Sequence, residues 1–163
     1  FPTRRSSDLD TEIPYTVFRS RDERTESIMQ AISNTSNFVM SGSMWSLRKT
    51  FEPFFELAVF MTAPVEICAE RIRIRALLQW GNRVLPGGDM YESNDIYKDY
   101  IATAQSYEKD VSPKICRAQH EQWIRELPCP VLRVDGTQSI SDNAVFAIAQ
   151  YKMILDGHPI CAS

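Results

Sequence analysis

The 163-residue chain has few of the features that mark a membrane, secreted or nucleic-acid-binding protein. Its longest apolar runs span about seven residues, well short of the roughly 18 that a membrane-spanning helix needs. No leader-type apolar segment follows the first two arginines, and the formal net charge is −3 rather than strongly positive. We therefore expect a cytoplasmic protein that binds neither membranes nor nucleic acids.

The cysteines are sparse and lack metal-binding spacing. There are four of them, Cys68, Cys116, Cys129 and Cys161, and no two are arranged as the CxxC pair typical of zinc and redox sites. Cys68 and Cys116 fall at apolar positions of expected helices. We expect reduced, buried thiols and no metal site, with disulfides or zinc as the alternative.

A glycine-rich phosphate-binding loop is also absent. The chain contains no GxxxxGK[ST] sequence and no relaxed GxSGSGT equivalent, and SGSMWS at 41–46 is too short and follows the wrong strand. In P-loop enzymes the backbone N–H groups of this loop hold the phosphates, and one of its hydroxyls holds magnesium. We therefore expect this chain by itself to be inactive toward ATP.

The first nine residues, FPTRRSSDL, show neither helical nor strand periodicity. The string resembles the translation of a common short-read sequencing adapter, so we exclude 1–9 from the fold as an artefactual segment. A natural, disordered N-terminus is the alternative. On the first interpretation, the natural coding sequence is entered within the gene near Asp10.

The rest of the chain alternates between helical and strand patterns. Ser20 and Glu23 have the spacing of a capping box and predict a helix over about 21–33. The unbroken apolar run LAVFMT at 57–62 is typical of a buried parallel strand, and a helix from Pro64 to about Trp80 follows it.

Further elements complete this pattern. Strands are expected at 37–41 and 131–135, and GNRVLPGGDMY at 81–91 is expected to be a loop. One helix is lined by residues from Ile96 to Ala104; a second begins at Ser112 and Pro113, carries a stripe from Cys116 to Leu127, and stops before Pro128. A final helix is capped by Ser139 or Ser141, buries Val145, Ile148 and Ala149, and frays after Gly157. Strands separated by helices predict an α/β fold with a parallel sheet.

Small and polar residues follow the expected strands. Ligands of parallel α/β sheets bind beyond the carboxyl ends of the strands. At these ends lie SGS at 41–43, Thr62 with Ala63, and DGT at 135–137. Each segment is compatible with close approach to a ligand or with a plain turn, and Asp135 with a ribose contact or an Asp-Gly turn.

The stretch ERIRIR at 70–75 carries repeated positive charge on one helix. Arg71 and Arg75 lie four apart on one helical face, a like-charge spacing that costs a few tenths of a kcal/mol. Because guanidinium groups match phosphate oxygens, these arginines and Arg83 suggest a phosphate clamp. A solvated face with Glu66 and Glu70 pairing the arginines is the alternative.

Two further features allow more than one interpretation. The loop LPGGDMYE at 85–92 is either a mobile lid, whose Asp89 and Glu92 meet a metal or a basic group on closure, or an ordinary surface loop. His120, beside Trp123, is expected to have a structural role.

Taken in order, these segments resemble a family of small P-loop kinases related to adenylate kinase, often labelled AAA-family ATPases. The resemblance covers about 10–151, and its stretches are IPYT at 13–16, RDER at 21–24, VMSGSMW at 39–45, FELAVFMTAPVEICAERIRIR at 55–75, GNRVLPGGDMYE at 81–92 and HEQWIRELPCPVLRVDGT at 120–137. Full-length relatives begin with a strand, a GASGSGT-type loop, a helix and a second strand, none of which is present.

The resemblance therefore implies a truncated three-layer P-loop NTPase fold with strand order 2-3-1-4-5. The strands at 37–41, 57–62 and 131–135 would be the third, fourth and fifth. The partial domain would span 10–156 with a lid at about 76–95, followed by a frayed tail at 157–163.

The same resemblance implies a fragment of a monomeric, ATP-dependent phosphotransferase that uses ATP and Mg²⁺ in its intact form and acts on a small-molecule acceptor. Arg71, Arg75 and Arg83, with Arg73 as a weaker candidate, would stabilise the transferring phosphoryl group. The adenine or ribose would lie near Asp135, Gly136 and Thr137, and the acceptor near Ser41, Gly42, Ser43 and Asp89. The alternatives are a nucleotide-binding regulatory ATPase without an acceptor and a fragment with no present function.

Overall fold

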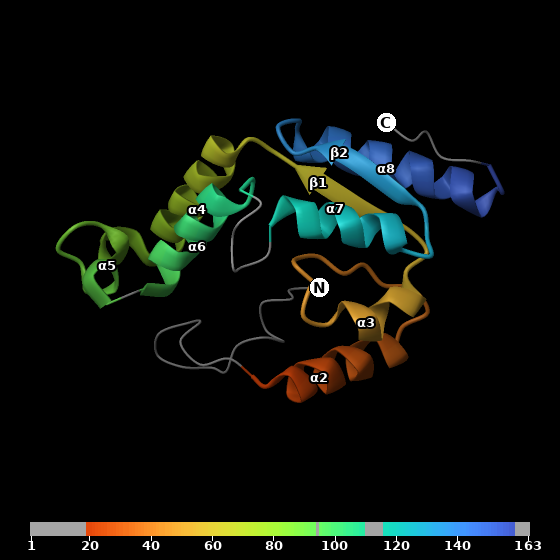
Figure 1. The fold of residues 1–163 in the computed structure, drawn as a ribbon, viewed down its shortest axis with the longest axis horizontal. Helices are drawn as coiled ribbons and strands as arrows, with labels where there is room; N and C mark the ends of the chain where they lie inside the picture. The colour runs from red at the N-terminus through yellow and green to blue at the C-terminus, as the bar shows by residue number, and fades with distance from the viewer. Residues whose placement is uncertain (1–18, 94, 110–115, 159–163) are drawn as a thin grey trace. The chain divides into compact units, whose positions relative to one another are not determined.

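The computed structural model describes residues 19–93, 95–109 and 116–158 (Figure 1). The chain forms two compact units, Phe1–Phe54 and Phe55–Ser163, which are considered separately. The expectations for 1–9, 13–16, Ser112, Pro113 and Cys161 lie outside the described residues.

The first unit contains helix α2 (Arg21–Ser33), the short helix α3 (Arg48–Phe51) and the 3-10 turn η1 (Glu52–Phe54). The capping box predicted for α2 is confirmed, because the Ser20 N–H donates to Glu23 Oε2 at 2.7 Å and the Glu23 N–H donates to Ser20 Oγ at 3.2 Å. Phe51 is fully buried and anchors α3. Local capping chemistry thus sets where α2 begins.

The strand predicted at 37–41 is wrong. These residues form a bend and irregular backbone, and the side chain of Val39 is 78% exposed. A strand needs a neighbour that pairs with its backbone N–H and C=O groups. Within the described residues, the two strands that pair both belong to the second unit, so an apolar stretch of suitable composition stays unpaired here.

The second unit is built on strands β1 (Ala58–Thr62) and β2 (Val131–Asp135), which confirms both predictions. They pair in parallel, from Ala58 opposite Val131 to Thr62 opposite Asp135. The parallel α/β class predicted from the sequence is therefore confirmed.

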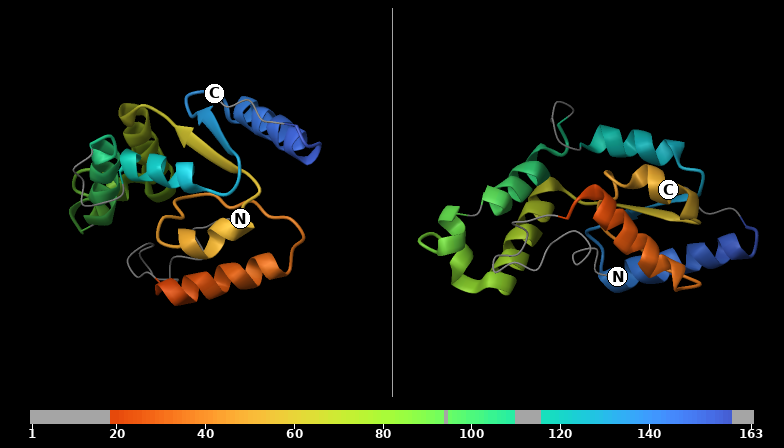
Figure 2. Two further views of the ribbon diagram at one scale, coloured as in Figure 1. Left: turned by 45° about the vertical axis from the view of Figure 1, so that its right-hand side comes forward. Right: turned by 90° about the horizontal axis from the view of Figure 1, so that it is seen from below.

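Helices α7 (Arg117–Glu126) and α8 (Ile140–Leu155) lie on opposite faces of this sheet (Figure 2). On the face toward α7, the ring of His120 lies 6.3 Å from that of Phe60. Alternate residues of β2 are buried, with Leu132 at 0% exposure and Val134 at 5%. The described residues of this unit thus place the sheet between two helical layers.

The helix predicted after Ser139 or Ser141 is confirmed as α8, and the cap is Ser139, whose side chain accepts from the Asp142 N–H. The prediction that it buries Val145, Ile148 and Ala149 is wrong. Val145 and Ile148 are 68% and 56% exposed, Ala149 is also exposed, and the buried residue of this helix is Gln150. A pair of five-residue strands is too small to cover the whole apolar face of a 16-residue helix.

Helix α4 (Val65–Trp80) follows β1 and packs against α6 (Asp95–Ser106) (Figure 1). Pro64 is its N-cap, and Gly81 ends it with a φ of 57°, a left-handed conformation that favours glycine. The prediction of a plain loop at 81–91 is wrong in part, because the 3-10 helix η2 (Gly81–Val84) and helix α5 (Asp89–Ser93) lie here. Met90, 1% exposed, gives this segment a small core of its own.

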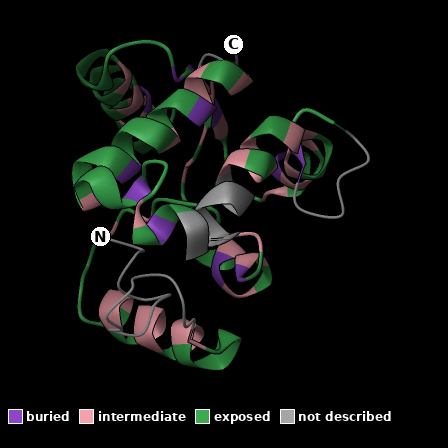
Figure 3. Cartoon of the chain, turned by 90° about the vertical axis from the view of Figure 1, so that its left-hand side faces the viewer, coloured by how far each residue is buried: buried purple, intermediate pink, exposed green. Residues whose placement is uncertain are grey.

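Buried residues are few and dispersed along the chain, as Figure 3 shows. Cys116 is buried, Cys68 and Cys129 are half-buried, and all three are free thiols, as predicted. Among the described helices, none has the length and apolar character that crossing a membrane requires.

Candidate functional site

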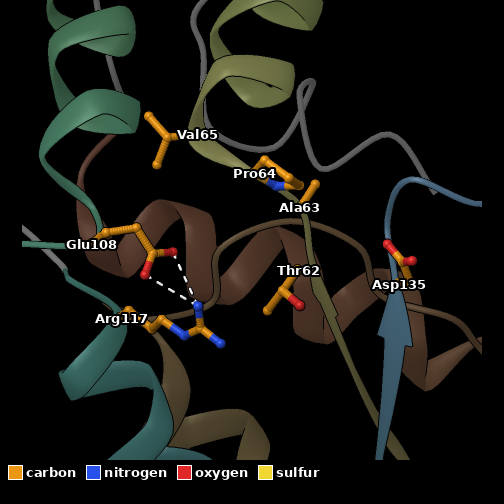
Figure 4. A pocket seen from close by; sticks show the side chains of 7 residues that line it. All are labelled: Thr62, Ala63, Pro64, Val65, Glu108, Arg117 and Asp135. Atoms are coloured by element: carbon orange, nitrogen blue, oxygen red, sulfur yellow. Dashed lines mark hydrogen bonds and ion pairs between the residues drawn. The ribbon is translucent and has the colours of Figure 1, made fainter.

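A pocket of about 320 Å³ lies at the edge of the sheet where β1 and β2 both end (Figure 4). It brings together the last residues of the two strands, the junction between β1 and α4, and two charged residues that flank 109–116. The lining residues are Thr62, Ala63, Pro64, Val65, Glu108, Arg117 and Asp135. The carboxyl edge expected from the sequence to bind ligands therefore holds a cavity.

Asp135 forms a tight turn at the end of β2. Its Oδ1 accepts from the Thr137 N–H at 2.8 Å and from Thr137 Oγ1 at 2.7 Å, whereas Oδ2 accepts a longer bond of 3.3 Å from Gln138 Nε2. The Thr137 bonds lower the pKa of Asp135, so the carboxylate remains ionised at neutral pH. The turn interpretation of Asp135 is thus confirmed, and Oδ2 retains acceptor capacity.

Gly136 links the end of β2 to the end of β1. Its N–H donates to the Thr62 carbonyl at 2.7 Å, and a Cβ at this position would lie 2.9 Å from that same oxygen. Its own carbonyl accepts from Arg71 Nη1 at 2.7 Å. A side chain of α4 is therefore fixed against the turn that follows β2.

The arginines predicted to form a phosphate clamp lie in different surroundings. Arg71 lies at the strand edge, where its Nη1 donates to the Gly136 carbonyl. Arg73 pairs with Glu70 at 3.6 Å, which matches the solvated-face interpretation for that residue. Arg75, one turn after Arg71, is exposed and has no side-chain partner within the described part of the chain.

Arg83 and Asp89 lie together in the segment of η2 and α5. Arg83 Nε and Nη2 donate to the two Asp89 oxygens at 3.0, 3.2 and 2.8 Å, a two-pronged pair that lowers the pKa of Asp89. Asp89 thus meets a basic group of its own segment. Ser41, Gly42 and Ser43 lie in the first compact unit, in an irregular and exposed stretch.

Sequence reasoning missed Glu108 and Arg117, which line the pocket. Arg117 Nη1 donates to the two Glu108 oxygens at 3.3 and 3.1 Å, and its Nε lies 3.7 Å from Glu121 Oε1. The sequence offered no signal for them. The helix was expected to begin at Ser112 and Pro113, which would place Arg117 beyond its first turn, whereas α7 begins at Arg117 with Cys116 as its N-cap.

Glu121 links the pocket to the sheet. Its two oxygens accept from Arg133 Nη1 at 2.9 Å and Nη2 at 2.5 Å, which lowers the pKa of Glu121. The same carboxylate also lies beside Arg117. Charges of alternating sign therefore run from Arg133 on β2 through α7 to Glu108 at the pocket.

The structural role expected for His120 is supported by its surroundings. Its Nδ1 is 2.7 Å from Tyr107 Oη, and its ring lies among those of Phe60, Tyr107 and Trp123. Burial lowers the pKa of His120 and, as the largest cause, raises the pKa of Tyr107 to about 12. Both rings therefore remain uncharged at neutral pH and fasten α7 to the segment after α6.

We expect this histidine to make stability depend on pH. Because its pKa is lowered in the folded state, the unfolded chain binds the extra proton more readily, and stability falls as the pH drops below about 6.5. Urea unfolding midpoints measured between about pH 7.5 and pH 5.5 should decline less in His120→Gln than in the parent chain. His158→Gln, which changes the exposed histidine, serves as the control and should keep the full decline. An unchanged decline in His120→Gln would contradict this assignment.

A parallel sheet between helical layers, with a polar pocket at its carboxyl edge, defines a parallel α/β protein with a candidate small-molecule site. Within the described residues, no group of three or more His, Cys, Asp or Glu side chains is placed to hold a metal ion. The chain is 30% identical over 140 residues to "Uncharacterized protein YqaC" of Bacillus subtilis (strain 168). The aligned region covers 83% of this chain and 77% of YqaC. It therefore belongs to the YqaC family. No family model and no solved structure matches it.

Proposed function

We propose that this chain is part of an ATP-dependent phosphotransferase with a P-loop NTPase fold, and that it contributes the arginine-bearing side of the nucleotide site. The carrying observation is the bond from Arg71 to the Gly136 carbonyl, which brings a guanidinium from α4 to the carboxyl edge of two parallel strands. That edge is where ligands of parallel α/β proteins bind. Arg75, exposed one turn later on the same face of α4, adds a second positive charge.

The described residues fit one part of such a site and not another. A guanidinium suits the charge that develops on a transferring phosphoryl group, and the small Gly136 permits close approach of a ligand. Neither a carboxylate cluster nor a glycine-rich loop that would hold magnesium and the phosphates is present among them. We therefore propose that this chain contributes positive charge and a close-fitting backbone beside the nucleotide. We assign it no role in binding magnesium.

The proposal is tested by single-turnover phosphotransfer with full-length YqaC and with this chain, side by side. Each protein is mixed in excess with γ-labelled ATP, Mg²⁺ and a panel of hydroxylated small molecules, and the products are separated. We expect label on an acceptor with YqaC and none with this chain, because this chain lacks the phosphate-binding loop.

The other outcomes are equally informative. Release of inorganic phosphate with every acceptor would replace the proposal by the regulatory ATPase. Tight ATP binding by YqaC without any hydrolysis would favour a nucleotide sensor. Failure of YqaC to bind ATP at all, or transfer by this chain alone, would overturn the proposal.

A further inference from the structure

The wall of the pocket carries a guanidinium that is only partly used. Arg117 contacts Glu108 through Nη1 and Glu121 through Nε. Its remaining nitrogen, Nη2, has no partner within the described residues, and Figure 4 shows a terminal nitrogen of Arg117 directed away from Glu108, toward the side on which Thr62 lies. Two carboxylates thus hold the group in place while leaving N–H donors available to the cavity.

The strand ends provide complementary groups. The hydroxyl of Thr62, a half-buried residue that lines the same pocket, has no hydrogen-bond partner in the described part of the chain. Among the residues that the structure describes, Asp135 Oδ2 accepts one bond, at 3.3 Å from Gln138. The pocket therefore offers a donor at Arg117, an acceptor at Asp135, and a hydroxyl of either kind at Thr62.

The remaining wall is apolar. Ala63, Pro64 and Val65 form the junction between β1 and α4 and line the cavity between these polar groups. At about 320 Å³ the cavity lies at the lower end of the range for small-molecule sites. An apolar wall with a few convergent polar groups suits a compact ligand that has both C–H faces and hydrogen-bonding edges.

The balance of charge selects among such ligands. The lining residues include one guanidinium against two carboxylates, Glu108 and Asp135, so a bare anion is disfavoured. Hydroxyl groups, by contrast, both donate and accept without carrying charge. We propose that this pocket binds a small molecule with vicinal hydroxyl groups, a sugar or the ribose of a nucleoside, held by Arg117, Thr62 and Asp135.

This inference rests on the proposed function in one respect: the hydroxylated ligand is taken to be a substrate of the phosphotransfer. Binding itself needs neither ATP nor turnover. A failure of the transfer assay with intact binding, or the reverse, therefore separates the two proposals.

The test is a titration of the full ¹⁵N-labelled chain, followed by amide NMR, with D-ribose, adenosine and inorganic phosphate in separate arms. We expect saturable shifts with ribose or adenosine at about millimolar Kd, and weaker or no binding of phosphate. Arg117→Met should weaken binding about tenfold or more, since it removes the free donor. Arg125→Met, on the exposed side of the same helix, is the matched control and should bind as the parent does.

A second variant distinguishes loss of the donor from a structural disturbance of α7 caused by replacing Arg117. Thr62→Val keeps the shape of the side chain and removes the hydroxyl, so it should weaken binding with little change in the amide spectrum away from the pocket. Binding by adenosine but not ribose would assign the site to nucleosides, and the converse to free sugars; both support the proposal. No saturable binding of either up to about 50 mM, parent-like binding by Arg117→Met, or tighter binding of phosphate than of both would overturn it.

Discussion

Replacing Leu132 with alanine is expected to lower the free energy of unfolding by about 2–5 kcal/mol. Leu132, the second residue of β2, is fully buried and pairs with Val59 of β1, so the truncation removes apolar contacts and leaves a cavity against the face of the sheet. Urea unfolding followed by far-ultraviolet circular dichroism measures the change. Since a small domain has only about 5–15 kcal/mol of stability, the loss should be visible as a large shift in midpoint.

The matched control is the same chemical change on the surface. Leu78 is 83% exposed on α4, where alanine is the better helix former, so Leu78→Ala should change stability by less than about 0.5 kcal/mol. Equal effects of the two variants would mean that β2 does not form the core of this unit.

Gly136→Ala is expected to cost about 1–3 kcal/mol, because its Cβ would meet backbone that cannot easily yield. The Thr62 carbonyl would be 2.9 Å away, Met61 Cγ 3.1 Å and Ala63 Cβ 3.3 Å. Relief requires the turn after β2 to move from the end of β1, which also breaks the bond from Arg71. Unfolding measurements and amide shifts at Thr62 and Asp135 report the two effects.

Gly81→Ala separates crowding from backbone strain. Gly81 has a φ of 57° and a ψ of −140°, with no atom within 4 Å of an added Cβ, so the variant introduces backbone strain of about 1–3 kcal/mol without a collision. It should leave the amide signals of Thr62 and Asp135 in place. If Gly136→Ala leaves them in place as well, the close approach of the two strand ends is wrong.

Local signals predicted most of the elements. Ser20 and Glu23 specify the start of α2 through contacts three residues apart, and the unbroken apolar run LAVFMT identifies β1. The stretch at 37–41 has the same apolar character, yet it is not a strand, because pairing depends on a neighbour that composition does not reveal. The exposure of Val145 on α8 likewise depends on how much sheet is available to cover that helix.

Part of the pocket lining could be placed from the sequence. Thr62, Ala63 and Asp135 were expected at the strand edge because parallel α/β topology brings the ends of its strands together. Glu108 and Arg117 escaped because their pairing joins two segments on either side of residues 109–116, where no periodicity relates one side to the other. Their opposite charges, nine positions apart, carry no information until the chain has turned back on itself.

The run of charges from Arg133 through Glu121 and Arg117 to Glu108 makes the wall of the pocket sensitive to salt concentration. All four side chains keep some exposure, so mobile ions penetrate and screen their attraction, with a Debye length of about 10 Å at 0.1 M salt. Concentrated electrolyte therefore loosens the orientation of Arg117. The affinity of this cavity for an uncharged ligand would consequently fall as ionic strength rises, although the ligand itself has no charge to be screened.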